Sequence, residues 1–464
     1  MIPQNYPQAN LSVFFRQFKL GGLLAQAGFR SRTIGMAPLA IIQFLVGLVC
    51  TERNLWRWFD EQPAESREAL PFQKSTVYAL LKNPHVNWRH LLLTLSVATT
   101  RWVKPFSRRR DAVFIVDDSL FDRHRSRTVD FLSRVYDHVE HRYRWGFRWL
   151  TIGWSDGTTF LPVLFSLLAS QQVHNRRRAT VSPIDGRTVG AKRRREALES
   201  APAVVVQALQ DALAAGITAR YVLFDRWFTT ARLVGDIVHQ TGLPVIGMVK
   251  AAPHRYYEFQ GRRWTLPQWY RHLRGQWSRH AVMGSVVATV MTAHGPLPVR
   301  IVFVRDRRGG SKAWLALWST DLALPDDEVV RIYGKRWAIE TFFKVAKSLL
   351  GIPREYQGRS YEGCIAHVTL VCIRYQWLAL EARKAEDVRT IGDLFFTQCQ
   401  ELQDITFAAV MDQIMAAFAA ALNEYLDLSE DQLEELFQRF LAKVPASLRE
   451  RMTRYASIEV FKAA

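Results

Sequence analysis

The chain is 464 residues long, about three times the length of a typical domain, so it can bury a sizeable core. Its composition, 48% hydrophobic and 23% charged with 25 Gly and 18 Pro, excludes a disordered, collagen-like or low-complexity protein. The 62 Lys and Arg outnumber the 43 Asp and Glu, and the resulting net charge of +19 favours a polyanionic partner, nucleic acid before a membrane surface. A basic housekeeping enzyme is the alternative that charge alone leaves open.

The N-terminal part shows no targeting or membrane-spanning pattern. Residues 1–20 lack a basic segment, a long apolar core and a small-residue cleavage site in secretory order. The longest apolar run, residues 36–50, is too short to cross a bilayer. We therefore expect a cytoplasmic protein without a membrane partner. The four cysteines form no CxxC motif, which argues against disulfides and structural zinc.

Hydrophobic periodicity divides the first half of the chain into two regions. Apolar residues recur at helical spacing from residue 11 to residue 100, which predicts a helical region over residues 1–107. From residue 111 short apolar strands alternate with amphipathic helices, and an Asp156-Gly157 turn joins two strands as a hairpin. The predicted strands are 111–116, 148–154, 159–167, 220–224 and 244–249, and the predicted helices are 192–215 and 229–241.

The second half returns to strands and then to helices. Strand-like segments occur at 285–291, 299–304 and 314–318, and one long helix is predicted over 327–350. This order indicates an α/β catalytic domain over residues 108–350 that carries a β-rich insertion over residues 250–327. Residues 351–464 are predicted to be helical, with a possible role in oligomerisation.

Two aspartates follow apolar strand segments directly. Asp117 comes after residues 114–116, and Asp225 comes after residues 222–224. A strand end presents such a side chain at the rim of a sheet, where a metal ion and a substrate can reach it. An Asp in this position is, however, commonly a turn or capping residue, so the two aspartates alone do not define a site.

The predicted helix 327–350 presents a third carboxylate. At about 100° per residue, one arc of about 60° contains four polar side chains: Tyr333, Arg336, Glu340 and Lys347. Lys344 adds a third cation. The alternative is a solvated face on which Glu340 forms i,i+4 ion pairs, each worth about 0.3 kcal/mol. The excess of cations suits a phosphate backbone lying along this face.

Three carboxylates from two strands and a helix can hold two Mg²⁺ ions, with Mn²⁺ as a possible substitute. These hard cations take oxygen ligands and keep open positions for water and phosphate oxygens. The combination of Asp117, Asp225 and Glu340 would therefore suit the hydrolysis of a phosphodiester bond.

The spacing of these residues resembles that of a known family, the DDE transposases of bacterial insertion sequences in the insertion-sequence-four group. The signature of that group is Tyr, two residues, Arg, three residues, Glu, six residues, Lys, and the segment from Tyr333 to Lys347 matches every spacing. The resemblance spans about residues 111–350. It implies an RNase H-like catalytic domain with a β-rich insertion before the glutamate, and it implies a helical N-terminal region that binds DNA ends.

The resemblance also implies roles for individual residues. Asp117, Asp225 and Glu340 would form the catalytic, metal-binding triad, with Asp118 as the alternative to Asp117. The residues implied to contact DNA phosphates, with Lys344 added from the helix pattern, are Tyr333, Arg336, Lys344 and Lys347. The family uses an aromatic residue of the insertion to hold a flipped base when DNA hairpins form, and no motif selects among Trp264, Trp269 and Trp277.

The function implied is cut-and-paste transposition: metal-dependent cleavage of element ends in double-stranded DNA, followed by strand transfer into target DNA. A nuclease without strand transfer and a DNA-binding regulator on an inactive transposase scaffold are the alternatives. The expected partners are terminal inverted repeats and target DNA, and the expected assembly is a homodimer on paired ends. An apolar stripe between Phe407 and Leu422 is a possible interface, or it packs within the chain.

Several basic stretches surround the proposed aspartates in the sequence. Each is a candidate phosphate contact, and a solvated surface is the alternative for any one of them. They comprise Arg123, Arg125, Arg127, Arg142, Arg144, Arg148, Arg176, Arg177, Arg178, Lys192, Arg193, Arg194 and Arg195.

Overall fold

A computed structural model describes most of the chain. The described residues are 9–30, 36–62, 72–107, 111–137, 140–252, 255–273, 281–306, 313–352, 358–384 and 390–400, with parts of 411–449. The stripe from Phe407 to Leu422 and the side chain of Trp277 lie largely or wholly outside these residues, so their predicted roles remain predictions.

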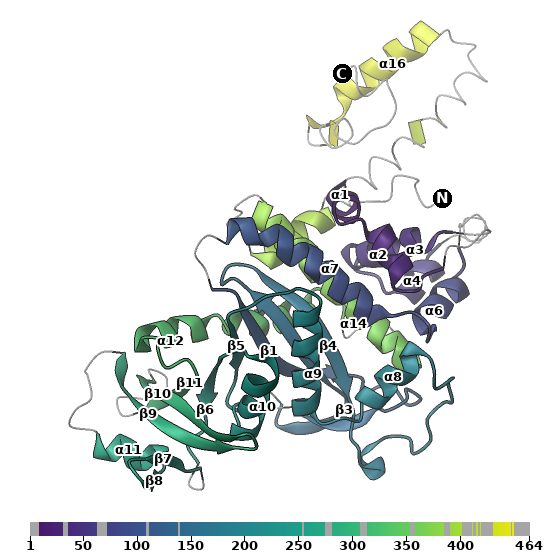
Figure 1. The fold of residues 1–464 in the computed structure, drawn as a ribbon. Helices are drawn as coiled ribbons and strands as arrows, with labels where there is room; N and C mark the ends of the chain where they lie inside the picture. Colours follow the sequence, from purple (N-terminus) through teal and green to yellow (C-terminus); the bar gives the residue numbers. More distant parts are fainter. Residues whose placement is uncertain are drawn as a thin grey trace.

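The N-terminal region is helical, as the periodicity predicted (Figure 1). Asparagine side chains cap two of its helices: Asn54 accepts a hydrogen bond from the Arg57 N–H, and Asn87 accepts one from the His90 N–H. The helices are α1 (Ala9–Gln17), α2 (Leu20–Gln26), α3 (Pro38–Gly47), α4 (Leu55–Asp60), α6 (Lys74–Lys82) and α7 (Trp88–Val103), with short 3-10 turns η1 (Leu48–Thr51) and η2 (Lys104–Phe106).

Among the described residues, eleven strands form one mixed sheet in the order β2-β3-β1-β5-β6-β11-β10-β9-β7-β8, with β4 also pairing with β3. The strands are β1 (Val113–Asp122), β2 (Ser133–Asp137), β3 (Arg142–Ser155), β4 (Phe160–Leu168), β5 (Tyr221–Phe224), β6 (Val245–Val249), β7 (Tyr257–Phe259), β8 (Arg262–Trp264), β9 (Val282–Thr292), β10 (Gly295–Arg305) and β11 (Trp314–Ser319). β1, β5 and β6 are parallel, and β1 pairs antiparallel with β3.

Helices separate the strands along the chain. α8 (Val189–Glu196), α9 (Ala201–Ala214) and α10 (Ala231–Thr241) lie between β4 and β6, and α9 and α10 cover the side of the sheet that faces the viewer in Figure 1. The predicted single helix over residues 192–215 is wrong. Ser200 caps a second helix whose second residue is Pro202, and a proline is tolerated in a first turn but not in a helix interior.

The β-rich segment extends the same sheet. β11 pairs antiparallel with β6, and β10, β9, β7 and β8 follow outward, with α11 (Leu266–His272) beside the last two strands (Figure 1). The three strands predicted here from alternation are present as β9, β10 and β11, each longer than predicted.

The predicted long helix 327–350 is also wrong in one respect. It consists of α12 (Asp326–Gly334) and α13 (Trp337–Ser348), and Lys335 and Arg336 lie at the junction. Gly334 ends α12, as the low helical propensity of glycine favours. The signature residues therefore occupy two short helices rather than one face of a single helix.

Helix α14 (Tyr361–Lys384) is the central helix of the core. All its residues from Tyr361 to Leu380 are buried, and it packs against β4, α3, α6, α7 and α13. By length and apolar composition it could cross a membrane, but the whole apolar window is buried inside the protein, as in the core helix of a globular fold. In the C-terminal part the structure describes a further helix at residues 391–400 and α16 (Glu430–Lys443).

Candidate active site

The parallel pairing of β1 and β5 brings Asp117 and Asp225 together. Val116 pairs with Phe224, so the next residues of the two strands, the two aspartates, lie at the same level of the sheet. Asp225 directly follows β5, as predicted. Asp117 does not end its strand, because β1 continues to Asp122 by pairing with the long strand β3.

The backbone after β5 fixes the Asp225 carboxylate. Its Oδ1 accepts hydrogen bonds from the N–H groups of Trp227 (2.9 Å) and Phe228 (3.1 Å). Thr229 closes this turn against β6, where a Cβ on Gly247 would lie 2.3 Å from the Thr229 Oγ1. Glycine is therefore required at residue 247 for the turn to pack in this position.

Burial raises the pKa values of both aspartates, and the charges of neighbouring carboxylates add to this rise. Burial, followed by the charge of Asp225, raises the pKa of Asp117 from its ordinary 3.8 to about 7, although Arg336 and the Asp118 N–H act in the opposite direction. Burial likewise raises the pKa of Asp225, and the N–H groups of Phe228 and Trp227 partly offset this. Two carboxylates whose ionisation is this unfavourable form a site that favours a cation.

Asp118 has a different environment from Asp117. Successive side chains alternate across a strand, so the two aspartates point to opposite sides of β1. Both oxygens of Asp118 accept hydrogen bonds from Arg148 on β3, from Nε and from Nη2, each at 2.7 Å. This forked pair neutralises Asp118.

Arg336 connects Asp117 with Glu340. Its Nη1 lies 3.3 Å from the Asp117 Oδ2, and its Nη2 donates to the Glu340 Oε1. The junction between α12 and α13 places this guanidinium, 14% exposed, over the aspartates, whereas the Glu340 side chain is 36% exposed. The structure therefore brings Asp117, Asp225, Arg336 and Glu340 into one site.

The remaining signature residues differ in position. Tyr333 is largely buried, and its hydroxyl forms no hydrogen bond of standard geometry with any described residue. Burial raises the pKa of this phenol to about 12, with Arg336 acting in the opposite direction. Lys347 is exposed farther along α13, where desolvation lowers its pKa and the carboxylates of Asp137 and Asp122 offset this. Lys344 is also exposed on α13.

The donor set fits a divalent cation only in part. Asp117 and Asp225 offer buried oxygen donors, and the Tyr333 hydroxyl forms no hydrogen bond of standard geometry with a described residue. Glu340, however, is engaged by Arg336. Within the part of the chain that the structure describes, no three acidic, histidine or cysteine side chains are grouped closely enough to hold a metal ion.

Several arginines of the basic stretches form hydrogen bonds or ion pairs within the protein. Arg123 is buried and donates to the Gly358 carbonyl, and Arg144 pairs with Asp122 at 2.8 Å. Arg194 is buried between Glu362 (2.6 Å) and Asp130 (3.3 Å). Because these guanidinium groups already have partners, the solvated or DNA-facing interpretation is wrong for them.

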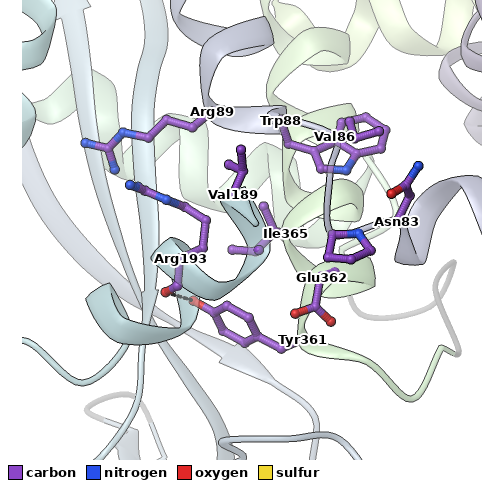
Figure 2. A pocket seen from close by; sticks show the side chains of 11 residues that line it. Asn83, Val86, Trp88, Arg89, Val189, Arg193, Tyr361, Glu362 and Ile365 are labelled. Carbon is purple, nitrogen blue, oxygen red and sulfur yellow. Dashed lines mark hydrogen bonds between the residues drawn. The ribbon is translucent and has the colours of Figure 1, made fainter. Parts of the chain in front are cut away.

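The small cavity in Figure 2 belongs to the same structural network. It lies between α7, α8 and α14, where Tyr361 donates to the Arg193 carbonyl at 3.5 Å. Its volume of about 20 Å³ has room for one water molecule and not for a substrate.

Sequence reasoning missed an exposed aromatic residue beside the aspartates. Trp227, two residues after Asp225, is 54% exposed. Lys250 at the end of β6 lies 5.3 Å from the ring centre, and the Arg226 guanidinium lies 5.8 Å from it. An exposed indole flanked by cations is the arrangement that nucleic-acid-binding surfaces use for bases and phosphates. Its position two residues after the second aspartate was the signal available in the sequence.

Comparison with protein families decides the class. A family described as DDE superfamily endonuclease matches residues 66–307, more than half of the chain. The chain belongs to this family. It is therefore an endonuclease of the DDE type, which implies a DNA substrate, and the broad part of the sequence prediction is confirmed. The match contains Asp117 and Asp225 and ends before Glu340. No curated protein matches the chain.

Proposed function

We propose that this DDE endonuclease is a transposase of the insertion-sequence-four group, which cleaves the ends of its own DNA element and joins the freed 3′ ends to target DNA. The observation that carries the proposal is the contact of Arg336 with both Asp117 and Glu340. One residue of the Tyr-Arg-Glu-Lys spacing, Arg336, thereby contacts the first of the two aspartates that the sheet brings together and pairs with a second residue of the spacing, Glu340.

Asp117, Asp225 and Glu340 are proposed to bind two Mg²⁺ ions, or Mn²⁺ in their place. Glu340 would have to exchange Arg336 for the cations, and its partly exposed position allows this. Bound ions would supply the activated water or 3′-hydroxyl and stabilise the leaving oxygen. The Arg336 guanidinium, once released from Glu340, has donors for a phosphate of the cleaved strand.

Asp117 is favoured over Asp118 as the first ligand. Arg148 occupies both oxygens of Asp118, whereas Asp117 is buried next to Asp225 and shares only one oxygen with Arg336. Asp118 and Arg148 would then orient each other beside the site.

The exposed cations of α13 are proposed to position the DNA. Lys344 and Lys347 would contact successive phosphates, and the Tyr333 hydroxyl would donate to a phosphate oxygen or to water. Phosphate contacts of this kind fix register on the duplex without reading its sequence.

The proposal extends to the domains of the chain and to its assembly on DNA. The central strand order, with β3 and β4 on one side of β1 and the parallel β5 and β6 on the other, supports an RNase H-like catalytic domain. The helical region over residues 1–107 would bind the terminal inverted repeats, and two chains would act on paired ends in the bacterial cytoplasm, associated with the nucleoid. Joining two ends at one target requires two sites, and each chain offers one.

The test uses linear DNA that ends in the inverted repeats flanking the gene, a target plasmid and Mg²⁺. We expect wild-type protein to cut the ends and join them to the plasmid, and we expect Asp225→Asn to bind the same DNA and do neither. Cutting without any joined product would favour the nuclease alternative. Binding without metal-dependent cutting by the wild type would favour the regulator.

A further inference from the structure

The β-rich extension of the sheet carries a large excess of positive charge. Residues 250–312 contain 12 Lys and Arg and only two acidic residues, Glu258 and Asp306. The endonuclease chemistry described above uses none of these cations except Lys250. Such an excess requires either solvent or a polyanion nearby.

A hollow in this segment collects part of that charge. It has a volume of about 520 Å³, lies between β8 and α11, and no acidic side chain lines it; the lining residues are Arg262, Arg263, Trp264, Gln268, Arg271 and His272. Within the described residues, none of the three arginines forms an ion pair. In this they differ from Arg144 and Arg194, which pair with carboxylates within the fold.

Local structure holds this lining in place. Thr265 and Gln268 form a capping box at the start of α11, and the buried Trp269 anchors the helix against the sheet. Trp264 stacks on Trp269 with an interplanar angle of 9°, and the ring centre of His272 lies 5.0 Å from that of Trp264. The cations thus stand on a hairpin and a helix that are fixed to each other.

We propose that this hollow binds the sugar-phosphate backbone of duplex DNA, at a distance from the catalytic carboxylates. This inference rests on the proposed function, because it gives a second contact to the DNA that is cut. Guanidinium groups bind phosphates through two parallel hydrogen bonds, and three of them around one hollow match adjacent phosphates of one strand. Pockets for small apolar ligands are instead enclosed and lined mainly by hydrophobic side chains.

The sheet sets the spacing between the two contacts. From β5, which precedes Asp225, six steps across the sheet lead through β6, β11, β10, β9 and β7 to β8. At about 4.8 Å per step these six steps span about 29 Å across the sheet, which corresponds to about eight base pairs of duplex. A duplex shorter than this cannot reach both the carboxylates and the hollow.

The experiment measures affinity for cognate end DNA as a function of salt and duplex length, in the Asp225→Asn background so that the DNA remains intact. We expect Arg262→Ala and Arg271→Ala each to flatten the salt dependence by up to about one unit, and Arg271→Lys to retain it. This flattening of the salt dependence should occur with duplexes that extend 16 base pairs beyond one side of the cleavage site. It should be absent with duplexes that extend only four base pairs. Arg439→Ala, an exposed arginine on α16, is the matched control and should change nothing.

Unchanged affinity and salt dependence for Arg262→Ala and Arg271→Ala on the long duplex would overturn the inference. An equal loss of affinity on the short duplex would also overturn it. So would a result in which the two substitutions weaken binding of inorganic phosphate or of anionic vesicles but not of DNA. These results are distinguishable from failure of the proposed function. That failure would appear as wild-type protein that binds long DNA through the hollow yet neither cuts nor joins it.

Discussion

The guanidinium of Arg336 lies 3.3 Å from the carboxylate of Asp117, although 219 residues separate them in the sequence. The same side chain also donates to Glu340 one helical turn later. Arg336 therefore stabilises the ionised form of Asp117 and engages Glu340 in an ion pair.

This relationship predicts the behaviour of Arg336 variants. Arg336→Ala should reduce DNA cleavage by about 100-fold or more, since it removes a charge aimed at the reacting phosphate. It should also flatten the salt dependence of DNA affinity by up to about one unit. Arg336→Lys keeps the charge but not the fork, so its salt dependence should remain while cleavage stays impaired. Cleavage rates and binding at several salt concentrations measure both effects.

The matched control is Arg331→Ala. Arg331 lies one turn earlier on α12 and pairs with Glu328 and Asp111 away from the aspartates. If Arg336→Ala cuts DNA as fast as this control, then Arg336 has only a structural role.

The two neighbouring aspartates should respond differently to loss of charge. Asp117→Asn should remove cleavage to background, because the carboxylate faces Asp225. Asp118→Asn should leave measurable cleavage, because both oxygens of Asp118 pair with Arg148 and its charge acts on the other two aspartates only from a distance. Cleavage at equal DNA occupancy compares the two variants. An inactive Asp118→Asn beside an active Asp117→Asn would reverse the assignment of the first ligand.

The sequence predicted much of this site because its signals are local. An apolar strand before Asp225 and the fixed spacing from Tyr333 to Lys347 are visible in the residues themselves. The break at Gly334 and Lys335 was missed, since a helix of uninterrupted amphipathic period was assumed. The Arg148–Asp118 pair depends on the cross-strand register of β1 and β3, in which Arg148 lies opposite Leu120, and no sequence pattern specifies that register.

Non-local contacts also explain why some arginines of the basic stretches, which the sequence suggested as phosphate contacts or solvated surface, pair within the fold instead. The run containing Arg194 looks solvated in sequence because three of its neighbours are also basic. Its partners Asp130 and Glu362 are distant in the chain, and the fold alone brings them together.

The raised pKa of Asp117 predicts a pH-dependent stability. A carboxyl group with a pKa of about 7 in the folded protein and 3.8 when unfolded holds its proton more tightly in the folded state. Its contribution to the free energy of unfolding is therefore full below pH 4 and lost as the pH rises through 7. Asp117→Asn cannot ionise and therefore avoids this fall in stability. With a chelator present, the variant should be more stable than wild type at pH 8, by at most about 4 kcal/mol.

Urea unfolding of both proteins between pH 4 and pH 8 measures this difference. It should shrink toward pH 4, and saturating Mg²⁺ should stabilise the wild type at pH 8 but not the variant. A stability difference that is independent of pH, or one that grows toward pH 4, would contradict a raised pKa for Asp117 in the folded protein.

Trp227 should contact an unpaired base near the cleavage position. Its ring is 54% exposed, with Lys250 5.3 Å away. Stacking on an aromatic ring is worth about 1–3 kcal/mol per base. Trp227→Ala should therefore weaken binding to DNA with a frayed end by about 5-fold to 100-fold, whereas Trp227→Phe should retain most of the affinity. Phe440→Ala, an exposed aromatic on α16, is the control. An equal loss on fully paired DNA would indicate a phosphate-side or structural role for Trp227.

The buried ion pair between Arg194 and Glu362 predicts a large stability effect without a direct effect on chemistry. Both side chains are less than 10% exposed, and the pair joins α8 to the core helix α14. Glu362→Ala removes the nearest carboxylate and leaves the guanidinium with Asp130 at 3.3 Å and the Ser182 carbonyl at 2.6 Å. Removing one member of a buried pair typically costs about 3–5 kcal/mol. Asp185→Ala breaks the exposed pair with Arg187 and should cost far less, because solvent screens exposed ion pairs.

Urea unfolding midpoints of these two variants give the comparison. Glu362→Gln is a third variant for this comparison, because its amide oxygen can still accept a hydrogen bond from Arg194. Its loss of unfolding free energy should lie between the losses of the two alanine variants. In the folded Glu362→Ala protein, DNA affinity should equal that of wild type, because neither partner faces the carboxylates. Equal destabilisation by Glu362→Ala and Asp185→Ala would show that the pair between α8 and α14 does not stabilise the fold.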